Sequence, residues 1–264
     1  MKRNGIFLLL LALLLQALRG PSETVAFFYA LDQDFQTLKT NGTPAGAPLK
    51  VGSRNIASLQ LQTHRVYAVK MGSGAVETAA SAQALLARVR CDLAFSVGPV
   101  GALSDALPVG SWHTVTNVVA YQKGAWTANG FQPSPTSPMV LEPNAAALKL
   151  PALFTTNAPI AVASGEMFIA SSGQRQQLHE STGADAVDMN LFGLTTVCAD
   201  HRVPLFCWRV VSDQADDNAS EAFKKFATSY NGAGGQAIAE IIATLPANSN
   251  SPAAYPNLIK ALSP

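Results

Sequence analysis

The sequence contains few charged residues. Of its 264 residues, 13% are charged and 48% are hydrophobic, and the formal net charge is only +1. Because proteins that bind nucleic acid carry a basic excess to neutralise phosphates, this balance argues against a nucleic-acid partner. The sequence also has no run of like charges, which excludes an electrostatic tail. A chain of this length and apolar content can bury a substantial core.

Cysteine and histidine are scarce as well. The 3 cysteines are too few for a disulfide scaffold, and because two of them lie in apolar surroundings we expect buried thiols, with one disulfide as the alternative. The 4 histidines are scattered singly, and the cysteine and histidine spacings match no metal site. The sequence therefore predicts neither a metal centre nor a cofactor. These residues are Cys91, Cys198, Cys207, His64, His113, His179 and His201.

The N-terminal residues have the pattern of an export signal. Lys2 and Arg3 precede an apolar run, Ile6 to Leu15, that is too short to span a bilayer of about 30 Å comfortably. We therefore expect residues 1–20 to be a signal peptide and residues 21–264 to form one domain. After cleavage that domain would be secreted or periplasmic, with no stable membrane association. The alternative is an uncleaved anchor, which also places the domain outside the cytoplasm.

Segments of strand and helix pattern alternate along the chain. Strands are predicted near residues 24–30, 65–71, 91–97, 111–121, 159–165, 183–189 and 203–211, and helices over 31–38, 75–90, 190–201 and 220–243, with a short one at the C-terminus. Residues 122–157 are rich in proline, and we expect a long loop there. Because the strands are apolar throughout, the prediction is an α/β fold, a three-layer α/β/α sandwich around a mixed, mostly parallel sheet.

Polar and glycine-rich segments follow five of the predicted strands. The plainest is "CWRVVSDQAD", where an apolar strand stops abruptly on Ser212 and Asp213 with further acids behind. In sheets of this kind ligands bind beyond the carboxyl ends of the strands, so we expect the five segments to converge on one rim. They are Gly72–Gly74, Gly98–Gly101, Ser164–Glu166, Asp188–Asn190 and Ser212–Asp213.

Four of the motifs carry a resemblance to a known family. They are "FSVGPVGAL…GSW", "ASGEMFI", "ADAVDMN" and "VPLFCWRVVSDQAD", and their order resembles the purine nucleoside and uridine phosphorylase superfamily. Within it, the chain is most similar to the 5′-methylthioadenosine/S-adenosylhomocysteine nucleosidases, over about residues 24–245. The resemblance implies a homodimer or higher homo-oligomer that cleaves the N-glycosidic bond of a nucleoside in a cleft at the rim of the sheet.

The resemblance gives Asp213 the central role. This residue falls on the family's strand-end aspartate, which protonates the leaving purine at N7, and Ser212 falls on the serine that helps to hold it. A purine anion is a difficult leaving group, and a positioned acid can accelerate its departure by about 10²–10⁴-fold. The alternative role for Asp213 is to cap the helix that follows.

The resemblance also implies a binding pocket for base and sugar. Phe168 and Ile169 fall where the family stacks the base and offers backbone groups to its edge, and Phe223 matches an aromatic residue that closes the base pocket. Met189 falls on a methionine beneath the ribose. Ordinary burial in the core is the alternative for Phe168 and for Met189.

Two positions depart from the family pattern. Asn190 stands where the family has a glutamate that accepts bonds from the ribose 2′- and 3′-hydroxyls. Since an amide has one acceptor oxygen and no charge, we expect weaker ribose binding, a changed sugar preference or lost activity. Asp34 stands where the family has the longer glutamate that activates the attacking water. Asp34 is therefore a candidate base, with a place in the first turn of a helix as the alternative.

The choice between hydrolysis and phosphorolysis depends on an anion site. The segment "CDLAFSV" before Gly98 lacks the arginine that the family's phosphorylases carry there, which favours hydrolysis. Arg209 matches a strand arginine that the nucleosidases share, and with Gly98 it is a further candidate for substrate contact. The Gly72–Gly74 loop could still cradle phosphate through its N–H groups.

The sequence thus predicts an exported purine nucleosidase with Asp213 as its acid, a small-molecule nucleoside as its partner and no cofactor. The alternatives are a phosphate-dependent phosphorylase and a catalytically weakened nucleoside-binding or storage protein.

Overall fold

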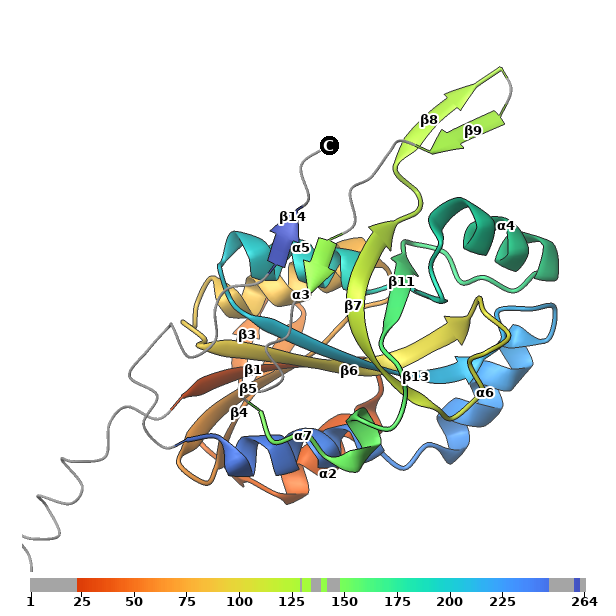
Figure 1. Cartoon of the computed structure of the whole chain (residues 1–264). Helices are drawn as coiled ribbons and strands as arrows, with labels where there is room; N and C mark the ends of the chain where they lie inside the picture. The colour runs from red at the N-terminus through yellow and green to blue at the C-terminus, as the bar shows by residue number, and fades with distance from the viewer. Residues whose placement is uncertain (1–22, 129, 134–138, 142–147, 247–258, 262–264) are drawn as a thin grey trace, which may run out of the picture.

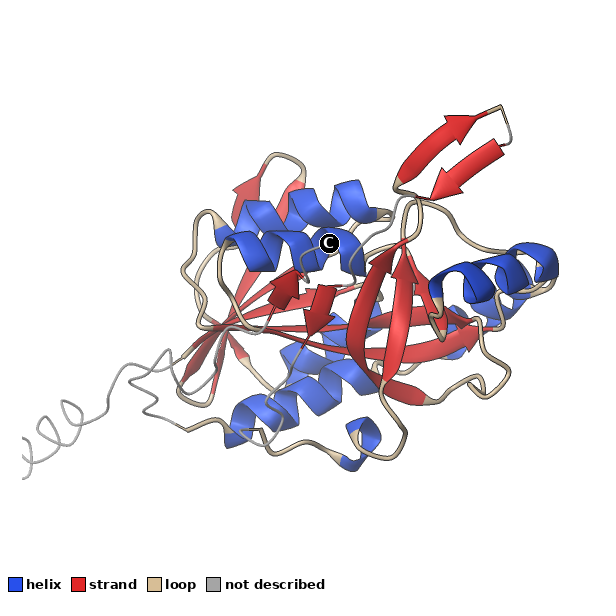
Figure 2. Ribbon diagram, turned by 45° about the horizontal axis from the view of Figure 1, so that its top comes forward, coloured by secondary structure: helices blue, strands red, loops and turns tan. Residues whose placement is uncertain are grey.

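The structure, a computed structural model, describes residues 23–128, 130–133, 139–141, 148–246 and 259–261. The predicted signal peptide, residues 1–20, lies outside the described residues. Helices cover both faces of a central sheet (Figures 1 and 2), which is the three-layer arrangement expected from the alternating pattern. Within the described residues, none of the helices has the length and apolarity needed to cross a membrane.

The centre of the sheet is built from parallel strands. β1 (Thr24–Tyr29) lies between β5 (His64–Lys70) and β6 (Leu93–Ala102), and β13 (Leu205–Asp213) runs parallel to β6. Phe27 and Phe28 of β1 are both fully buried, but they belong to different apolar clusters because successive side chains of a strand point to opposite faces. A strand covered on both faces has to be apolar throughout, and the sequence shows this pattern.

Antiparallel strands extend the sheet at its edges, so the sheet is mixed. β5 pairs with β4 (Arg54–Leu61), which also pairs with the short β2 (Thr43–Pro44) and β3 (Leu49–Val51). At the other edge, β10 (Met139–Leu141) lies between β7 (Trp112–Ala120) and β14 (Ile259–Ala261). The hairpin β8–β9 (Gly124–Thr127 and Gly130–Pro133) extends away from the rest of the protein (Figures 1 and 2).

Part of the sheet closes into a ring. β6 pairs with β13, β13 with β7, β7 with β11 (Ile160–Ser164), β11 with β12 (Ala186–Asp188), and β12 again with β6. As a result, Gly101 of β6 is the register partner of both Val187 and Asp213. The ends of β12 and β13 therefore meet at one point, as predicted for the strand-end segments.

The helices form the two outer layers. α3 (Ala75–Leu86) and α5 (Leu191–Asp200) pack together on one face, and α2 (Asp32–Thr40) and α7 (Ala233–Thr244) on the other. Leu85 and Leu194 belong to the apolar cluster of Phe28, whereas Leu38 and Ile238 belong to that of Phe27. The remaining helices are α4 (Ser172–Thr182), α6 (Ala219–Ser229) and the 3₁₀ turn η2 (Ala152–Phe154).

Several local predictions were wrong. The helix expected over residues 220–243 is divided into α6 and α7, because Gly232 has a φ of 78°, a left-handed conformation that ends helices. Gly98–Gly101 is part of β6 and not a loop beyond it. Near the C-terminus, where a short helix was expected, residues 259–261 are described and form β14, and the flanking residues lie outside the described ones. α4 was not predicted at all. The long segment 122–157 includes β8, β9, β10 and η2.

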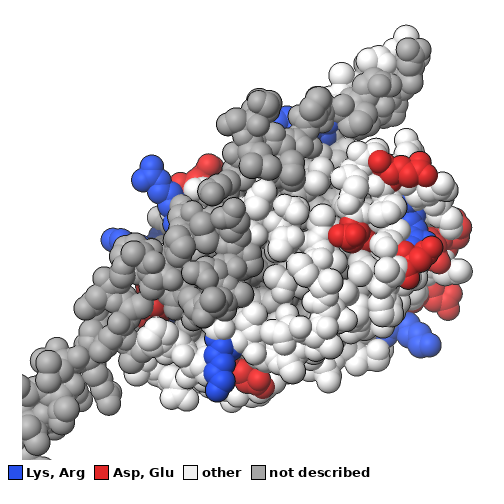
Figure 3. All heavy atoms as spheres, viewed as in Figure 1, with Lys and Arg blue, Asp and Glu red and all other residues white. Residues whose placement is uncertain are grey.

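The cysteines and the charged surface follow the expectations from composition. Cys91, Cys198 and Cys207 are all buried with free thiols, which confirms the first of the two expectations for them. Burial raises the pKa of Cys207 to about 12, so this thiol stays protonated at neutral pH. On the face shown in Figure 3 charged side chains are sparse, and the basic ones are scattered.

Candidate active site

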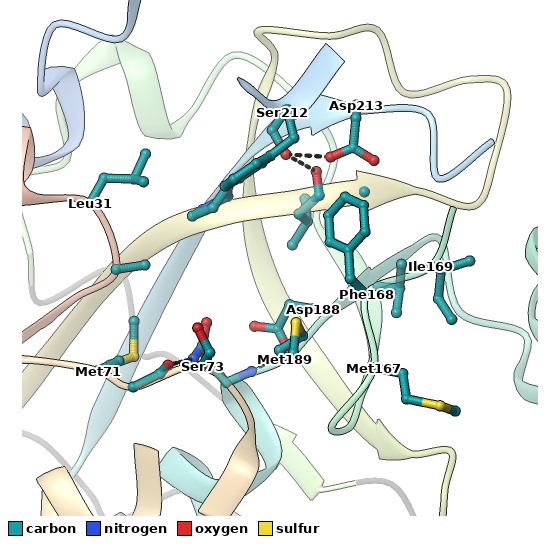
Figure 4. Close-up of a pocket in the computed structure, with 18 of the residues that line it drawn as sticks. Leu31, Met71, Ser73, Met167, Phe168, Ile169, Asp188, Met189, Ser212 and Asp213 are labelled. Carbon is teal, nitrogen blue, oxygen red and sulfur yellow. Dashed lines mark hydrogen bonds between the residues drawn. The ribbon is translucent and has the colours of Figure 1, made fainter. Parts of the chain in front are cut away.

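A cavity of about 190 Å³ opens at the carboxyl ends of the central strands. Figure 4 shows how side chains from distant parts of the chain point into it. Seven of the residues predicted from the sequence line this cavity: Phe168, Ile169, Met189, Asn190, Ser212, Asp213 and Phe223. The Gly72–Gly74 loop contributes Gly72 and Ser73. The strand-end segments therefore converge on one site.

Asp213 is the last residue of β13 and is 1% exposed. Burial raises the pKa of its carboxyl group, and the bonds that it accepts from Ser212 and from the backbone N–H of Ala215 oppose that shift. Ser212 Oγ lies 2.8 Å from Asp213 Oδ2 and 3.0 Å from the Val100 carbonyl oxygen, and one hydroxyl proton cannot serve both acceptors. When Asp213 is protonated it can donate to Ser212, which then donates to Val100. The arrangement favours a neutral acid.

Gly101 makes room for this carboxyl group. A Cβ atom at position 101 would lie 2.9 Å from Asp213 Oδ1 and 3.1 Å from the Cβ atom of Ala215. The close approach follows from the register, in which Gly101 and Asp213 are partners on adjacent strands. Because Gly101 has no side chain, the carboxyl group of Asp213 can pack directly against the backbone of β6.

Two aromatic rings form the wall near Asp213. Phe168 and Phe223 meet edge to face, with ring centroids 5.8 Å apart and an interplanar angle of 62°. Phe168 is 42% exposed, which is high for a large apolar side chain and is typical of a residue that contacts a ligand. Its segment is held at Met167, whose carbonyl oxygen accepts a 2.9 Å bond from the Tyr121 hydroxyl.

The opposite end of the cavity is formed by the end of β12. Asp188 accepts bonds from the backbone N–H groups of Asn190 and Leu191 and thereby caps α5. Asn190 Nδ2 donates to the Gly72 carbonyl oxygen at 2.6 Å and to Thr78 Oγ1 at 2.8 Å. Asn190 thus ties β12 to the Gly72–Gly74 loop. Met189 presents an apolar side chain between these polar groups (Figure 4).

Three predicted site residues, Gly98, Arg209 and Asp34, lie outside the cavity lining. Gly98 is within β6, where a Cβ atom would meet the Cβ atom of Ala30 at 3.0 Å. Arg209 is fully buried in β13, and its guanidinium donates to Asp188 Oδ2 at 3.3 Å and to the Trp208 carbonyl oxygen at 3.0 Å. Gly98 thus packs against Ala30 and Arg209 bonds to Asp188, and these two partners line the cavity.

Asp34 lies in the first turn of α2, where its side chain contacts α7, and it is fully buried. Its Oδ1 atom accepts a 2.5 Å bond from the Tyr230 hydroxyl and a 3.0 Å bond from the N–H of Gly235 in the first turn of α7. Burial raises the pKa of Asp34 to about 6, against the opposing effects of the Tyr230 bond, the Gly235 bond and the charge of Arg209. Asp34 itself does not line the cavity, but its backbone N–H donates to the carbonyl oxygen of Leu31, which does.

The described residues contain no group of three or more histidine, cysteine, aspartate or glutamate side chains that could hold a metal ion. The groups that the lining offers include the carboxyl group of Asp213, the aromatic wall and the amide of Asn190. A buried acid beside an aromatic slot suits proton transfer to a flat, weakly basic ring.

Comparison with known proteins identifies the family. The family model of the phosphorylase superfamily matches residues 24–243. The chain belongs to this superfamily. The 5′-methylthioadenosine/S-adenosylhomocysteine nucleosidase of Staphylococcus epidermidis is 28% identical over 178 residues, which cover 63% of this chain and 76% of the relative. The predicted superfamily is confirmed, and this relative bears the name of the predicted branch.

Solved structures of the superfamily share the fold of this member. An S-adenosylhomocysteine nucleosidase from Streptococcus pyogenes, solved with 5-methylthiotubericidin, has a TM-score of 0.72 and 18% identity, with 85% of this chain and 98% of that chain covered. A futalosine hydrolase from Helicobacter pylori has a TM-score of 0.69 and 17% identity, with 85% and 97% covered. These similarities confirm the predicted fold class.

Sequence reasoning missed several residues around the site of this superfamily member. Glu166 Oε1 accepts a 2.9 Å bond from the N–H of Val76 in the first turn of α3. Asp217, just before α6, accepts a 2.6 Å bond from the Ser172 hydroxyl of α4. The segment between Glu166 and Ser172, which carries Phe168, is therefore held at both ends by carboxylates at helix N-termini.

Proposed function

We propose that this superfamily member hydrolyses the N-glycosidic bond of purine nucleosides, with Asp213 as the general acid. The observation that carries the proposal is the buried Asp213 carboxyl group, whose raised pKa favours the protonated form, in a cavity whose wall is the Phe168–Phe223 pair. The names of the related proteins, which are nucleosidases, support the same reaction class. An adenine- or hypoxanthine-type base is the expected leaving group.

The reaction needs one proton delivered and one taken up. The bond from C1′ to N9 breaks, its electron pair moves to the purine, and Asp213 donates a proton to N7. Positive charge develops on the sugar, and a water molecule adds to C1′ and releases a proton. A positioned acid contributes about 10²–10⁴-fold to such a step. Because the acid stabilises the leaving base directly, the reaction requires no metal or cofactor.

The cavity favours water over phosphate as the nucleophile. Among the described residues that line it there is no arginine, and the lining cation, Lys70, is paired with Asp32 at 2.8 Å. The Gly72–Gly74 loop leads into α3, and the first turn of that helix already binds the carboxylate of Glu166. A phosphate ion would have to compete with this internal anion.

We propose Asp34 as the group that takes up the proton of the attacking water. With a pKa of about 6 it is ionised at neutral pH, and its Oδ2 atom has no hydrogen-bond partner among the described residues. Arg209 is close enough to lower the pKa of Asp34, and its Nη2 atom is also without a partner there. Since Asp34 does not line the cavity, direct transfer of the proton requires the attacking water to come within reach of Asp34 Oδ2, on the side of Arg209.

Export and self-association are also part of the proposal. The apolar run after Lys2 and Arg3 supports secretion or transfer to a periplasm, and N-terminal sequencing of the mature protein would test it. A homodimer or higher homo-oligomer is expected from the family resemblance, and light scattering during gel filtration would measure it.

The decisive experiment measures base release from adenosine, inosine, 2′-deoxyadenosine, 5′-methylthioadenosine and uridine, each with and without phosphate. Release of purine and free sugar without phosphate, reduced at least about 100-fold in Asp213→Asn, is the expected result. Release that requires phosphate would identify a phosphorylase. Tight purine binding without release from any of the five would identify a binding or storage protein.

A further inference from the structure

The sugar end of the cavity has no free carboxylate. Of the described residues that line the cavity, the carboxylates are Asp188 and Asp213, and Asp213 lies beside the aromatic wall. Asp188 Oδ1 accepts bonds of 3.1 Å from the N–H groups of Asn190 and Leu191, and its Oδ2 accepts a 3.3 Å bond from Arg209 Nε. Both oxygens of Asp188 are therefore already occupied by donors from the protein.

The amide of Asn190 is held in one orientation. Its Nδ2 atom donates to the Gly72 carbonyl oxygen and to Thr78 Oγ1, and these two bonds use both amide hydrogens. A rotated amide would place Oδ1 against the Gly72 carbonyl oxygen, two acceptors facing each other. Asn190 is 9% exposed and lines the cavity, so Oδ1 is the atom that it offers to a ligand. Ser73 adds a hydroxyl group at this end but no charge.

We propose that the cavity recognises the sugar through one neutral acceptor, Asn190 Oδ1, and that it therefore takes 2′-deoxynucleosides nearly as well as ribonucleosides. This inference rests on the proposed function for its substrate class. A carboxylate can accept both hydroxyls of a ribose diol on two charged oxygens, whereas the single amide oxygen of Asn190 is neutral, so a second bond from the 2′-hydroxyl adds only the strength of a neutral hydrogen bond. Loss of one neutral hydrogen bond changes affinity by about 2- to 13-fold, and loss of a charge-assisted bond by about 13- to 160-fold.

The presence of an amide at position 190, where the family has a carboxylate, has a local structural reason. A carboxylate at position 190 could not donate to the Gly72 carbonyl oxygen or to Thr78, and it would repel the first of them. Asn190 thus binds the Gly72–Gly74 loop to β12 and contacts the sugar with the same side chain. Nδ2 makes the hydrogen bonds to the loop, so only Oδ1 is left to accept hydrogen bonds from the sugar hydroxyls.

Calorimetry with two uncleavable ligands tests the proposal. 7-Deazaadenosine and 7-deaza-2′-deoxyadenosine lack the N7 atom that Asp213 would protonate, so binding is measured without turnover. We expect their dissociation constants for the wild-type protein to differ by less than about 13-fold. In Asn190→Asp, where a carboxylate faces the sugar, the preference for the ribose ligand should increase several-fold. Asn55→Asp, on the exposed part of β4, is the matched control and should leave the ratio unchanged.

The outcomes separate this inference from the proposed function. A ribose preference above about 13-fold in the wild-type protein would overturn the inference, as would failure of both ligands to bind. A small ratio in a protein that does not cleave adenosine or 2′-deoxyadenosine would refute hydrolysis and leave the sugar inference standing. Should Asn190→Asp fail to fold, the wild-type ratio still decides the question.

Discussion

A single methyl group at Gly101 should displace the carboxyl group of Asp213, the proposed general acid. In Gly101→Ala the new Cβ atom would lie 2.9 Å from Asp213 Oδ1, whereas ordinary contact begins at 3.4 Å, so the carboxyl group must move by about 0.5 Å. The Cβ atom of Ala215 at 3.1 Å and Cγ1 of Val187 at 3.4 Å restrict movement of the methyl group. Since a misplacement of 1 Å can reduce turnover about 100-fold, we expect a fall in kcat of roughly 10-fold, with a smaller effect on KM.

The assay is base release from adenosine, with the unfolding midpoint measured on the same samples. Gly173→Ala is the matched control, because Gly173 is exposed on α4 and the nearest side-chain atom to a new Cβ is 4.0 Å away. The control should keep wild-type kinetics. A folded Gly101→Ala protein with wild-type kcat would refute the reasoning, because it would mean that the position of Asp213 against β6 does not determine the rate.

Three further predictions follow from the site. Because burial raises the pKa of Asp213, kcat/KM should fall as the pH rises through that raised value, and a profile that is flat from about pH 4 to about pH 9 would contradict its role as an acid. Asp34, with its pKa raised to about 6, stabilises the fold fully below its unfolded value of 3.8 and loses this contribution as the pH rises through about 6. Asp34→Asn should therefore be more stable than the wild type by about 3 kcal/mol at about pH 8 in urea denaturation, and its kcat should fall at the same time if Asp34 takes up the proton of water. Glu166→Ala should release the segment that carries Phe168 and raise KM roughly 5-fold with little change in kcat, because the loss of a helix cap costs about 1 kcal/mol. Glu180→Ala, at an exposed position of α4, is the control and should leave KM unchanged.

The placement of the site could be predicted from the sequence because it depends on strand ends. The apolar runs that stop at Ser212 and Asp213, and at Asp188, indicate buried strands of a sheet, and the carboxyl ends of such strands meet at one rim. The departures at Asn190 and Asp34 were also visible, since a change of residue type needs no structure to be noticed. The bond that the amide nitrogen of Asn190 makes to the Gly72 carbonyl oxygen was not visible, because Gly72 is 118 residues away.

The contacts that shape the walls could not be predicted. Glu166 and Val76 are 90 residues apart, and Asp34 and Tyr230 are 196 apart, so neither pair has a local sequence pattern. The first pair joins a carboxylate to the first turn of α3, and the second joins a carboxylate to the residue that follows α6. One signal was present and was not used: Asn231 followed by Gly232 is a turn sequence, and it marks the break between α6 and α7 that lets Tyr230 reach Asp34.

The closed ring of strands has a consequence for folding. The cavity lining begins at Ala30 and ends at Phe223, and its polar groups come from the ends of strands that pair only after the ring has closed. Because the entropy of loop closure makes pairing between such distant segments slow, we expect the site to form only when the ring closes. A nucleoside analogue should therefore bind only molecules that have completed the ring, and at 100 times its dissociation constant it would add about 2.7 kcal/mol to the stability of the whole unit. Ligand binding during refolding would thus report closure of the ring directly.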